Sequence, residues 1–207
     1  MLSRRLRVLL PILLSLLGCS THLSAAEFAR VERLHGEAWI ERGATRERLA
    51  PTAVVAHDDQ LQTGPNSRLQ LTLSDGGTLN LGENTRLRAT TISESPAHSL
   101  AELDLKGAFR MVSGIFRGKH KQEWVIKTPV AVIGIRGTDF FAGPIDGALD
   151  VMVISGLVEV SNSAGHVLLE PKEGTVVGDA STAPSTPIIW GAAKVQRAFS
   201  MVDFPDR

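Results

Sequence analysis

The sequence predicts an all-β protein, a short-stranded β-solenoid-like or sandwich domain followed by a C-terminal amphipathic helix. Polar and apolar residues alternate without error over residues 68–73, as they do in a strand with one buried face. Similar runs return about every ten residues, separated by turns such as Asp75-Gly76-Gly77, a spacing typical of sandwiches, barrels and solenoids. Helical spacing of apolar residues begins only at Ile188.

Residues 1–26 are predicted to be a signal peptide. A basic start is followed by an apolar run too short for a stable membrane anchor, and Ser24-Ala25-Ala26 supplies the small residues that signal peptidase needs. This pattern predicts export to the periplasm. An alternative stays open, because Leu16-Leu17-Gly18-Cys19 resembles a bacterial lipobox. Lipidation of Cys19 would leave the protein lipid-anchored in the envelope.

Composition limits the possible classes of function. Cys19 is the only cysteine among the 207 residues, so no internal disulfide is expected and the fold depends on its core. Without the leader, which holds three of the 22 basic residues, 19 basic residues stand against 22 acidic ones. This balance argues against a nucleic-acid partner, which favours a basic surface.

Strands and turns are predicted throughout residues 28–178, the β domain. The apolar run Trp124–Phe141 is the densest after the leader, and Pro129, Gly134 and Gly137 divide it. We therefore expect two or three short buried strands with tight corners, not one helix. A β-branched residue at such a corner is expected to unfold the domain, as in Gly137→Val. The other expected strands cover residues 31–34, 37–41, 68–73, 78–81, 86–90, 103–105, 109–111, 150–154, 157–160, 167–169 and 175–177.

The composition changes after Gly178. Residues 179–187 hold two prolines among Ser, Thr and Ala, which predicts a linker. Apolar side chains then recur at helical spacing over residues 188–203, with Lys194 and Arg197 on the other face, which predicts the amphipathic helix. A helix that lies on a membrane surface is usually rich in Lys and Arg, and this one has only two basic residues. Its apolar side is therefore expected to dock on the domain or on a partner rather than on a membrane. Membrane contact is expected only if Cys19 is lipidated.

No stretch predicts a catalytic, cofactor or metal site. Residues 114–119 resemble a phosphate loop, but one residue is missing between the glycines and no Ser or Thr follows the lysine. The six histidines are scattered singly, and no Gly-x-Ser-x-Gly elbow occurs. Adjacent carboxylates on a strand point to opposite faces, so His57-Asp58-Asp59 is interpreted as a solvated turn rather than a metal or acid/base cluster. Arg136 and Asp139 could be a functional pair, but a structural role at a corner is favoured.

Several short motifs resemble, in their order, the FecR-domain family of bacterial envelope proteins over most of residues 28–178. The family signature is expected to have structural roles, because it lies at the corners of the densest apolar run. It consists of Thr128, Pro129, Arg136, Gly137, Thr138, Asp139 and Phe140. The other matching motifs are Gly36-Glu37-Ala38, Asp59-Gln60-Leu61-Gln62-Thr63-Gly64, Leu71–Leu79, Lys106-Gly107-Ala108-Phe109 and Val153–Val160.

The resemblance implies a periplasmic, non-enzymatic domain that relays a signal or holds partners and needs no cofactor. The best-known members sense iron-siderophore uptake, and their cytoplasmic amino-terminal segment controls a sigma factor. Only the signal peptide precedes the β domain here, so we expect a FecR-like protein without that segment. The resulting hypothesis is a binding or scaffold module in cell-envelope signalling. The alternatives are a structural envelope lipoprotein associated with peptidoglycan or the outer membrane, and a small periplasmic hydrolase.

The expected partner is an envelope protein or peptidoglycan. Three surfaces are candidates for this contact: a basic hairpin tip, an acidic turn and the exposed side of the terminal helix. The tip consists of Arg117, Lys119, His120 and Lys121, and the turn of Asp58 and Asp59.

Overall fold

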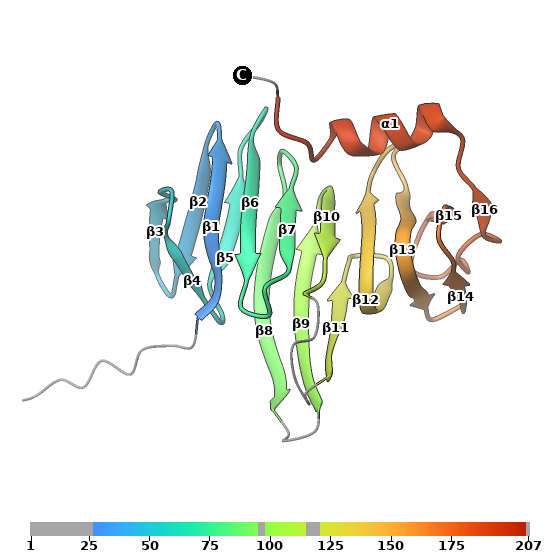
Figure 1. Cartoon of the computed structure of the whole chain (residues 1–207), viewed down its shortest axis with the longest axis horizontal. Coiled ribbons are helices and arrows are strands. Elements are labelled where there is room, and N and C mark those ends of the chain that lie inside the picture. Colours follow the sequence, from blue (N-terminus) through green and yellow to red (C-terminus); the bar gives the residue numbers. More distant parts are fainter. Residues whose placement is uncertain (1–26, 95–97, 115–120, 206–207) are drawn as a thin grey trace, which may run out of the picture.

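The computed structural model describes residues 27–94, 98–114 and 121–205, and it confirms the all-β prediction (Figure 1). These residues form one sheet of sixteen strands and a single helix, α1 (Ala192–Ser200). The strands are β1 (Glu27–His35), β2 (Ala38–Arg42), β3 (Thr45–Arg48), β4 (Val54–Ala56), β5 (Gln60–Thr63), β6 (Arg68–Leu73), β7 (Thr78–Leu81), β8 (Arg86–Glu94), β9 (His98–Lys106), β10 (Phe109–Val112), β11 (Lys121–Lys127), β12 (Val132–Gly143), β13 (Leu149–Asn162), β14 (Gly165–Leu169), β15 (Glu173–Val177) and β16 (Ile188–Ile189).

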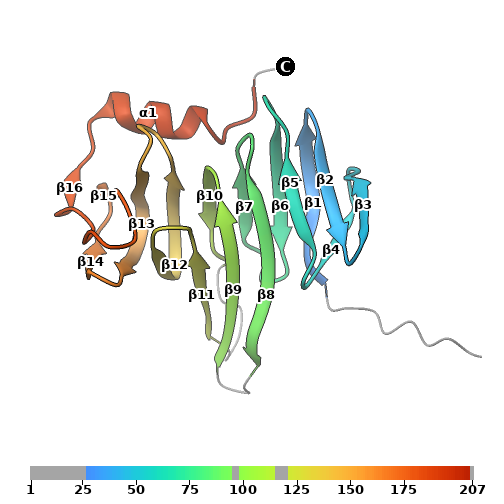
Figure 2. The ribbon, with the colours of Figure 1, turned by 180° about the vertical axis from the view of Figure 1, so that it is seen from behind.

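The sheet curls into a half-barrel with two arms. Arm A follows the order β3-β2-β5-β8-β9-β11, and arm B the order β4-β1-β6-β7-β10. Both arms end on β12, because β11 pairs with Val132–Ile135 and β10 pairs with Asp139–Ala142. Strand β13 pairs with β12 beyond both arms and is extended by β14 and β15. The views from opposite sides show arm B on one face and arm A on the other (Figures 1 and 2).

The bend between the arms lies in the apolar run that the sequence singled out. The register of β12 against β13 shifts between Arg136 and Asp139. Gly137 has φ +63° there, and Gly156 on β13 has φ +86°, both in the left-handed region that favours glycine. The expected corner is therefore real. At this corner, β12 passes from its pairing with β11 of arm A to its pairing with β10 of arm B.

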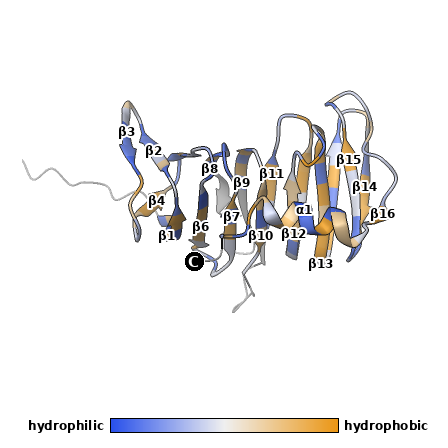
Figure 3. Cartoon of the chain, turned by 90° about the horizontal axis from the view of Figure 1, so that it is seen from above, coloured by the Kyte–Doolittle hydropathy of each residue, from blue (hydrophilic) through white to orange (hydrophobic). Residues whose placement is uncertain are grey.

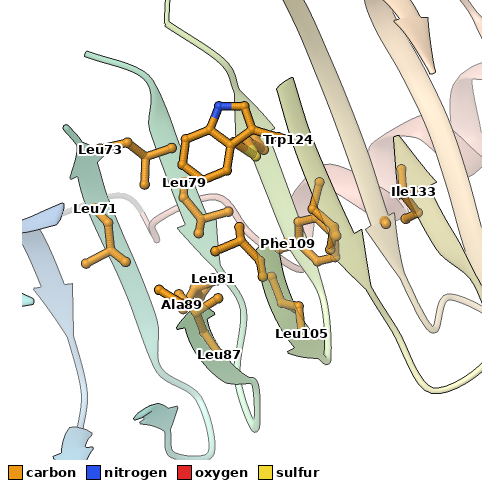
Figure 4. Packing of buried hydrophobic residues seen from close by; sticks show 14 of the residues in the cluster. Leu71, Leu73, Leu79, Leu81, Leu87, Ala89, Leu105, Phe109, Trp124 and Ile133 are labelled. Atoms are coloured by element: carbon orange, nitrogen blue, oxygen red, sulfur yellow. The ribbon is translucent and has the colours of Figure 1, made fainter. Parts of the chain in front are cut away.

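The core fills the space between the arms. Inward residues alternate along each strand, so that Leu79 and Phe109 from arm B lie with Leu87 and Leu105 from arm A (Figure 4). Trp124 is 1% exposed and belongs to the same cluster. A single core built from both arms explains how the domain is held without a disulfide.

The C-terminal helix is shorter than the predicted range 188–203. Ile188 and Ile189 form strand β16, which pairs with Glu173 and Gly174 of β15, and the helix begins at Ala192. Gly191 still has extended backbone, with ψ 153°. Pairing with an available sheet edge therefore overrides the helical spacing of the two isoleucines.

The helix lies against β12 and β13 (Figures 1 and 3). Ala198 and Val202 are fully buried in a second small cluster, together with Phe141 of β12 and Met152 of β13. Phe140 faces the main core while its neighbour Phe141 faces the helix, as the alternation of a strand requires. The apolar side of the helix is thus used for docking on its own domain. No helix among the described residues is long and apolar enough to cross a membrane.

Residues 179–187, the predicted linker, hold neither helix nor strand and are fastened to the sheet. Asn162 Nδ2 donates hydrogen bonds to the carbonyls of Asp179 and Thr182, at 3.2 and 2.7 Å. The backbone N–H of Ser185 donates to the carbonyl of Val176 at 3.0 Å. These bonds hold the segment between β15 and the helix against the sheet.

Asp179 is predicted to titrate well below the ordinary range. Ser181 donates its hydroxyl and its backbone N–H to Oδ1, and Thr182 donates its hydroxyl and its backbone N–H to the same carboxylate. These bonds lower the pKa of Asp179 from 3.8 to about 2, the Ser181 hydroxyl contributing most. Because the pKa is lower in the folded state, the stabilisation is present above the unfolded pKa and disappears as the pH falls toward 2.

An NMR titration of the Asp179 carboxyl carbon measures this pKa directly. We expect a midpoint near 2. The stability of Asp179→Asn should fall less than that of the parent protein over the same acid range. A midpoint at the ordinary value of an aspartate would show that the turn does not hold the carboxylate in solution.

Candidate functional site

The first part of the family signature forms the turn between β11 and β12. Thr128 Oγ1 donates to the carbonyl of Ala131 at 2.9 Å and accepts the backbone N–H of the same residue at 3.0 Å. Pro129, next to it, is exposed. The threonine therefore closes the turn by local hydrogen bonds, a structural role.

Asp139 pairs with Arg110, so the pairing considered with Arg136 is wrong. Arg110 donates from Nε to Oδ1 at 2.9 Å and from Nη2 to Oδ2 at 2.8 Å. The hydrogen bond to Asp139 raises the pKa of Arg110 above its ordinary value. Arg136 precedes the bend and is exposed on the other arm. The corner thus separates the two side chains, and Asp139 has the structural role that was favoured for it, with Arg110 as its partner.

The remaining signature residues hold the corner. The backbone N–H of Thr138 donates to Ser113 Oγ at 2.8 Å, and the N–H of Ser113 donates to the Thr138 carbonyl at 2.9 Å. Phe140 packs edge-on against Phe109 in the core, with ring centroids 5.6 Å apart. Lys127, the other charge in this run, pairs with the buried Glu102. Each of these contacts fastens strands together.

The acidic turn separates its two carboxylates. Asp59 is 5% exposed, accepts the backbone N–H of Ala56 at 2.8 Å and pairs with Arg42 Nε at 3.0 Å. Asp58 has φ +67° and an exposed side chain 3.7 Å from Arg88. Only Asp58 is therefore available to a partner, and Asp59 stabilises the turn.

The basic tip lies mainly outside the described residues. Arg117, Lys119 and His120 fall in the undescribed stretch, as does Cys19 near the amino terminus. Lys121 is the first residue of β11. These residues stay predictions from the sequence.

The C-terminal helix is fastened by a set of ionic contacts that the sequence did not indicate. Lys194 Nζ lies 2.5 Å from Asp150 Oδ1, and Asp150 is 1% exposed. Arg197 forms an exposed pair with Asp146, and this hydrogen bond is the main reason for the lowered pKa of Asp146. The Arg110 guanidinium also lies 5.0 Å from the ring centroid of Phe199. The pair that holds Asp139 thus reaches the helix as well.

Lys194→Ala is expected to lower the free energy of unfolding by about 2 kcal/mol, because it leaves the carboxylate of Asp150 buried without its cation. The loss is smaller than that of a fully buried pair, about 3–5 kcal/mol, because the Lys194 side chain is itself 24% exposed. Chemical denaturation measures the loss. Arg197→Ala is the matched control, since its ion pair with Asp146 is exposed and should leave the midpoint unchanged. Adding Asp150→Asn to Lys194→Ala should restore part of the stability. Equal effects of the two single variants would contradict the assigned importance of the buried pair.

A pocket of about 650 Å³ lies where the turns at one end of the half-barrel meet the end of α1. We call it the end pocket. Its wall comes from six places in the chain, including the signature turn at Thr128–Val130 and the family motif at Lys106–Ala108. The other contributions are Arg68, Glu83 and Asn84, residues 144–149 in part, and Ser200 and Met201. This gathering could not be inferred from the separate motifs.

A second surface is the outer side of arm A where it continues into β13 and β14. Leu157 and Leu168 are 51% and 54% exposed there, and Val132 is 38% exposed. Gly134 has no atom within 4 Å of the position a Cβ would occupy, so it leaves a shallow groove of about 230 Å³ beside the two leucines. We call this surface the uncovered face, because α1 covers the opposite side of the bend.

Within the part of the chain that the structure describes, no group of three His, Cys, Asp or Glu residues is arranged to hold a metal ion. His57 lies edge-on to Phe28, with ring centroids 5.7 Å apart. The described arrangement is a half-barrel domain in which the signature residue Asp139 connects β12 to β10 through Arg110, with one pocket and one apolar face of interest.

The class of protein that this arrangement defines is an all-β half-barrel domain with a docked C-terminal helix. Residues 59–159 match the family model described as FecR protein, and the chain therefore contains a FecR domain. The match lies within the β domain and includes the whole signature. No curated protein matches the chain.

Two crystal structures of a candidate anti-sigma factor from Parabacteroides distasonis ATCC 8503, at 2.50 and 1.65 Å resolution, have a similar fold. Each superposes with a TM-score of 0.53 at 23% sequence identity. The match covers 66% of this chain and 62% of that protein, so this chain corresponds to about three fifths of its length. At this identity the likeness establishes the fold.

Proposed function

We propose that the protein is a non-enzymatic signalling module of the periplasm, which binds a partner protein of the cell envelope. The FecR domain supports a signalling role. The contacts of the signature support a binding function over catalysis, because Asp139 and Thr128 are engaged in holding strands and turns. Export and periplasmic location rest on the pattern of the first 26 residues.

The uncovered face is the surface to which we assign the binding of this partner. Leu157 and Leu168 are both more than half exposed on one face of the sheet, and the Gly134 groove lies beside them. Apolar side chains gathered on a regular strand surface favour contact with another protein. Glu123 and Glu159 line the groove against one guanidinium, that of Arg136. We infer a partner that inserts an apolar side chain and carries basic residues around it.

Crosslinking in cells tests this function. A photoreactive amino acid in place of Leu168 should capture a specific envelope protein, and the added Leu157→Glu substitution should abolish the capture without changing the melting temperature. Val54→Glu is the matched control, because Val54 is also an exposed apolar strand residue but lies on β4. Capture that survives Leu157→Glu, or is lost equally with Val54→Glu, would contradict the assigned surface.

The structural envelope lipoprotein is the second candidate, favoured by Leu16-Leu17-Gly18-Cys19. Mass spectrometry of the mature amino terminus distinguishes the two. A start at Glu27 supports the exported soluble module, whereas a diacylated Cys19 supports the anchored protein.

A further inference from the structure

The end pocket has the size and lining of a small-ligand site. Its volume of about 650 Å³ lies within the usual range of about 300–1,000 Å³ for such sites. Most of its lining is apolar and comes from Leu105, Ala108, Val130, Ala148, Leu149 and Met201. The carbonyl of Met201 lies only 2.5 Å from where a Cβ on Gly82 would be, so the tail after α1 is packed tightly against the sheet at this wall. The pocket is therefore built by the fold and does not depend on one loop.

The charged side chains of the pocket wall are two cations, Arg68 and Lys106, and one carboxylate, Glu83. Arg68 donates from Nη1 to the carbonyl of Ser67 at 2.9 Å and from Nη2 to the carbonyl of Ser200 at 3.0 Å. Its Nε is buried and has no acceptor among the described residues. Lys106 is exposed at the rim and forms no ion pair within the described part of the chain. A buried donor without an acceptor costs about 1–3 kcal/mol, so an acceptor at this position would be stabilising.

The one carboxylate of the wall is already engaged. Glu83 Oε2 accepts the backbone N–H of Asn66 at 2.6 Å. Its negative charge offsets one of the two cations, so the net charge of the wall is +1, which matches a singly charged group better than a doubly charged one such as phosphate. The apolar lining favours a ligand with a hydrocarbon body.

We propose that the end pocket binds an aliphatic carboxylate, with its charged group toward Lys106 and Arg68 and its apolar body against Val130 and Leu149. This carboxylate could belong to a free aliphatic acid or to the carboxyl terminus of an apolar peptide. Both sources share the same recognition chemistry. The site is separate from the uncovered face, so this inference does not depend on the proposed protein partner.

Isothermal titration calorimetry of the purified protein tests the proposal with two probes. Octanoate represents the free acid, and an acetylated apolar tripeptide with a free carboxyl terminus represents the peptide. Octylamine and the amidated tripeptide are their controls, and neither should bind. Binding of octanoate alone, of the free tripeptide alone or of both would support the site and identify the source. Failure of both carboxylates to bind would overturn it.

Two variants place any binding in the end pocket. Lys106→Gln should weaken binding about tenfold, the effect of losing one charge-assisted hydrogen bond. Lys172→Gln removes an exposed charge outside the pocket and should leave the affinity unchanged. Ala148→Phe should fill the pocket and abolish binding, and a thermal melt confirms that the variant is folded. An affinity that Lys106→Gln leaves unchanged would overturn the proposal, even if Ala148→Phe does not fold.

Discussion

Replacing Gly156 with valine should lower the free energy of unfolding by about 3 kcal/mol, the combined cost of a β-branched residue in left-handed backbone and of overpacking. Gly156 has φ +86°, and a Cβ there would lie 2.5 Å from the carbonyl oxygen of Gly137 and 3.0 Å from Cα of Thr138. These are backbone atoms of the neighbouring strand, which cannot move aside as the end of a side chain can. The bend that joins the two arms would therefore have to open.

Gly137→Val is the matched comparison at the same corner. Gly137 has φ +63°, but no atom lies within 4 Å of its Cβ position. The substitution therefore has only the conformational cost of about 1–2 kcal/mol. The unfolding expected from the sequence is thus corrected to a moderate loss of stability. Urea denaturation of both variants should show the larger loss for Gly156→Val. Equal losses would mean that close approach of the strands is unimportant at the corner.

Trp124→Ala should be the most destabilising of these substitutions, by about 4 kcal/mol, as for other buried Trp residues truncated to alanine. Trp124 is 1% exposed and packs edge-on against Phe28, with ring centroids 6.1 Å apart. Its Nε1 donates to Asp75 Oδ2 at 3.0 Å. Asp75 also accepts the backbone N–H of Gly77 at 2.8 Å, so the indole connects the core to the turn between β6 and β7.

Trp39→Ala is the control for the loss of an indole. Trp39 is only partly buried, and the Arg46 guanidinium lies 5.0 Å from the centroid of the Trp39 ring. Its truncation should cost clearly less than that of Trp124. Trp124→Phe keeps most of the packing and removes the hydrogen bond to Asp75, so its loss should fall between the two. Denaturation midpoints that rank Trp39→Ala above Trp124→Ala would contradict the central position of Trp124 in the core.

The strands of the middle of the chain were predictable, because alternation is a local property. Residues 68–73 and 78–81 were expected as strands and are β6 and β7 in the structure. The turn between them contains Asp75 and Gly76, which favour this geometry by themselves. The corner in Trp124–Phe141 was also predictable, since glycines interrupt an apolar run that must be buried.

The partner of Asp139 was not predictable in the same way. Arg136 is near in sequence, but the bend at Gly137 directs it away, and Arg110 becomes adjacent through the pairing of β10 with β12. A signal was present in the alternation of Phe109, Arg110 and Met111, which marks Arg110 as outward. Only the register of two strands shows that Asp139 lies beside it.

Periodicity and turn residues thus determined the all-β class, the strands and the corner, because these depend on a few consecutive residues. The family signature was also visible in the order of short motifs. Tertiary structure decided which charges meet, where the helix begins and what lines the end pocket. Three features join residues that are distant in sequence: the pairing of β16 with β15, the docking of α1, and the turns that meet at the end pocket. The positions of these residues follow from strand register and from the bend between the arms.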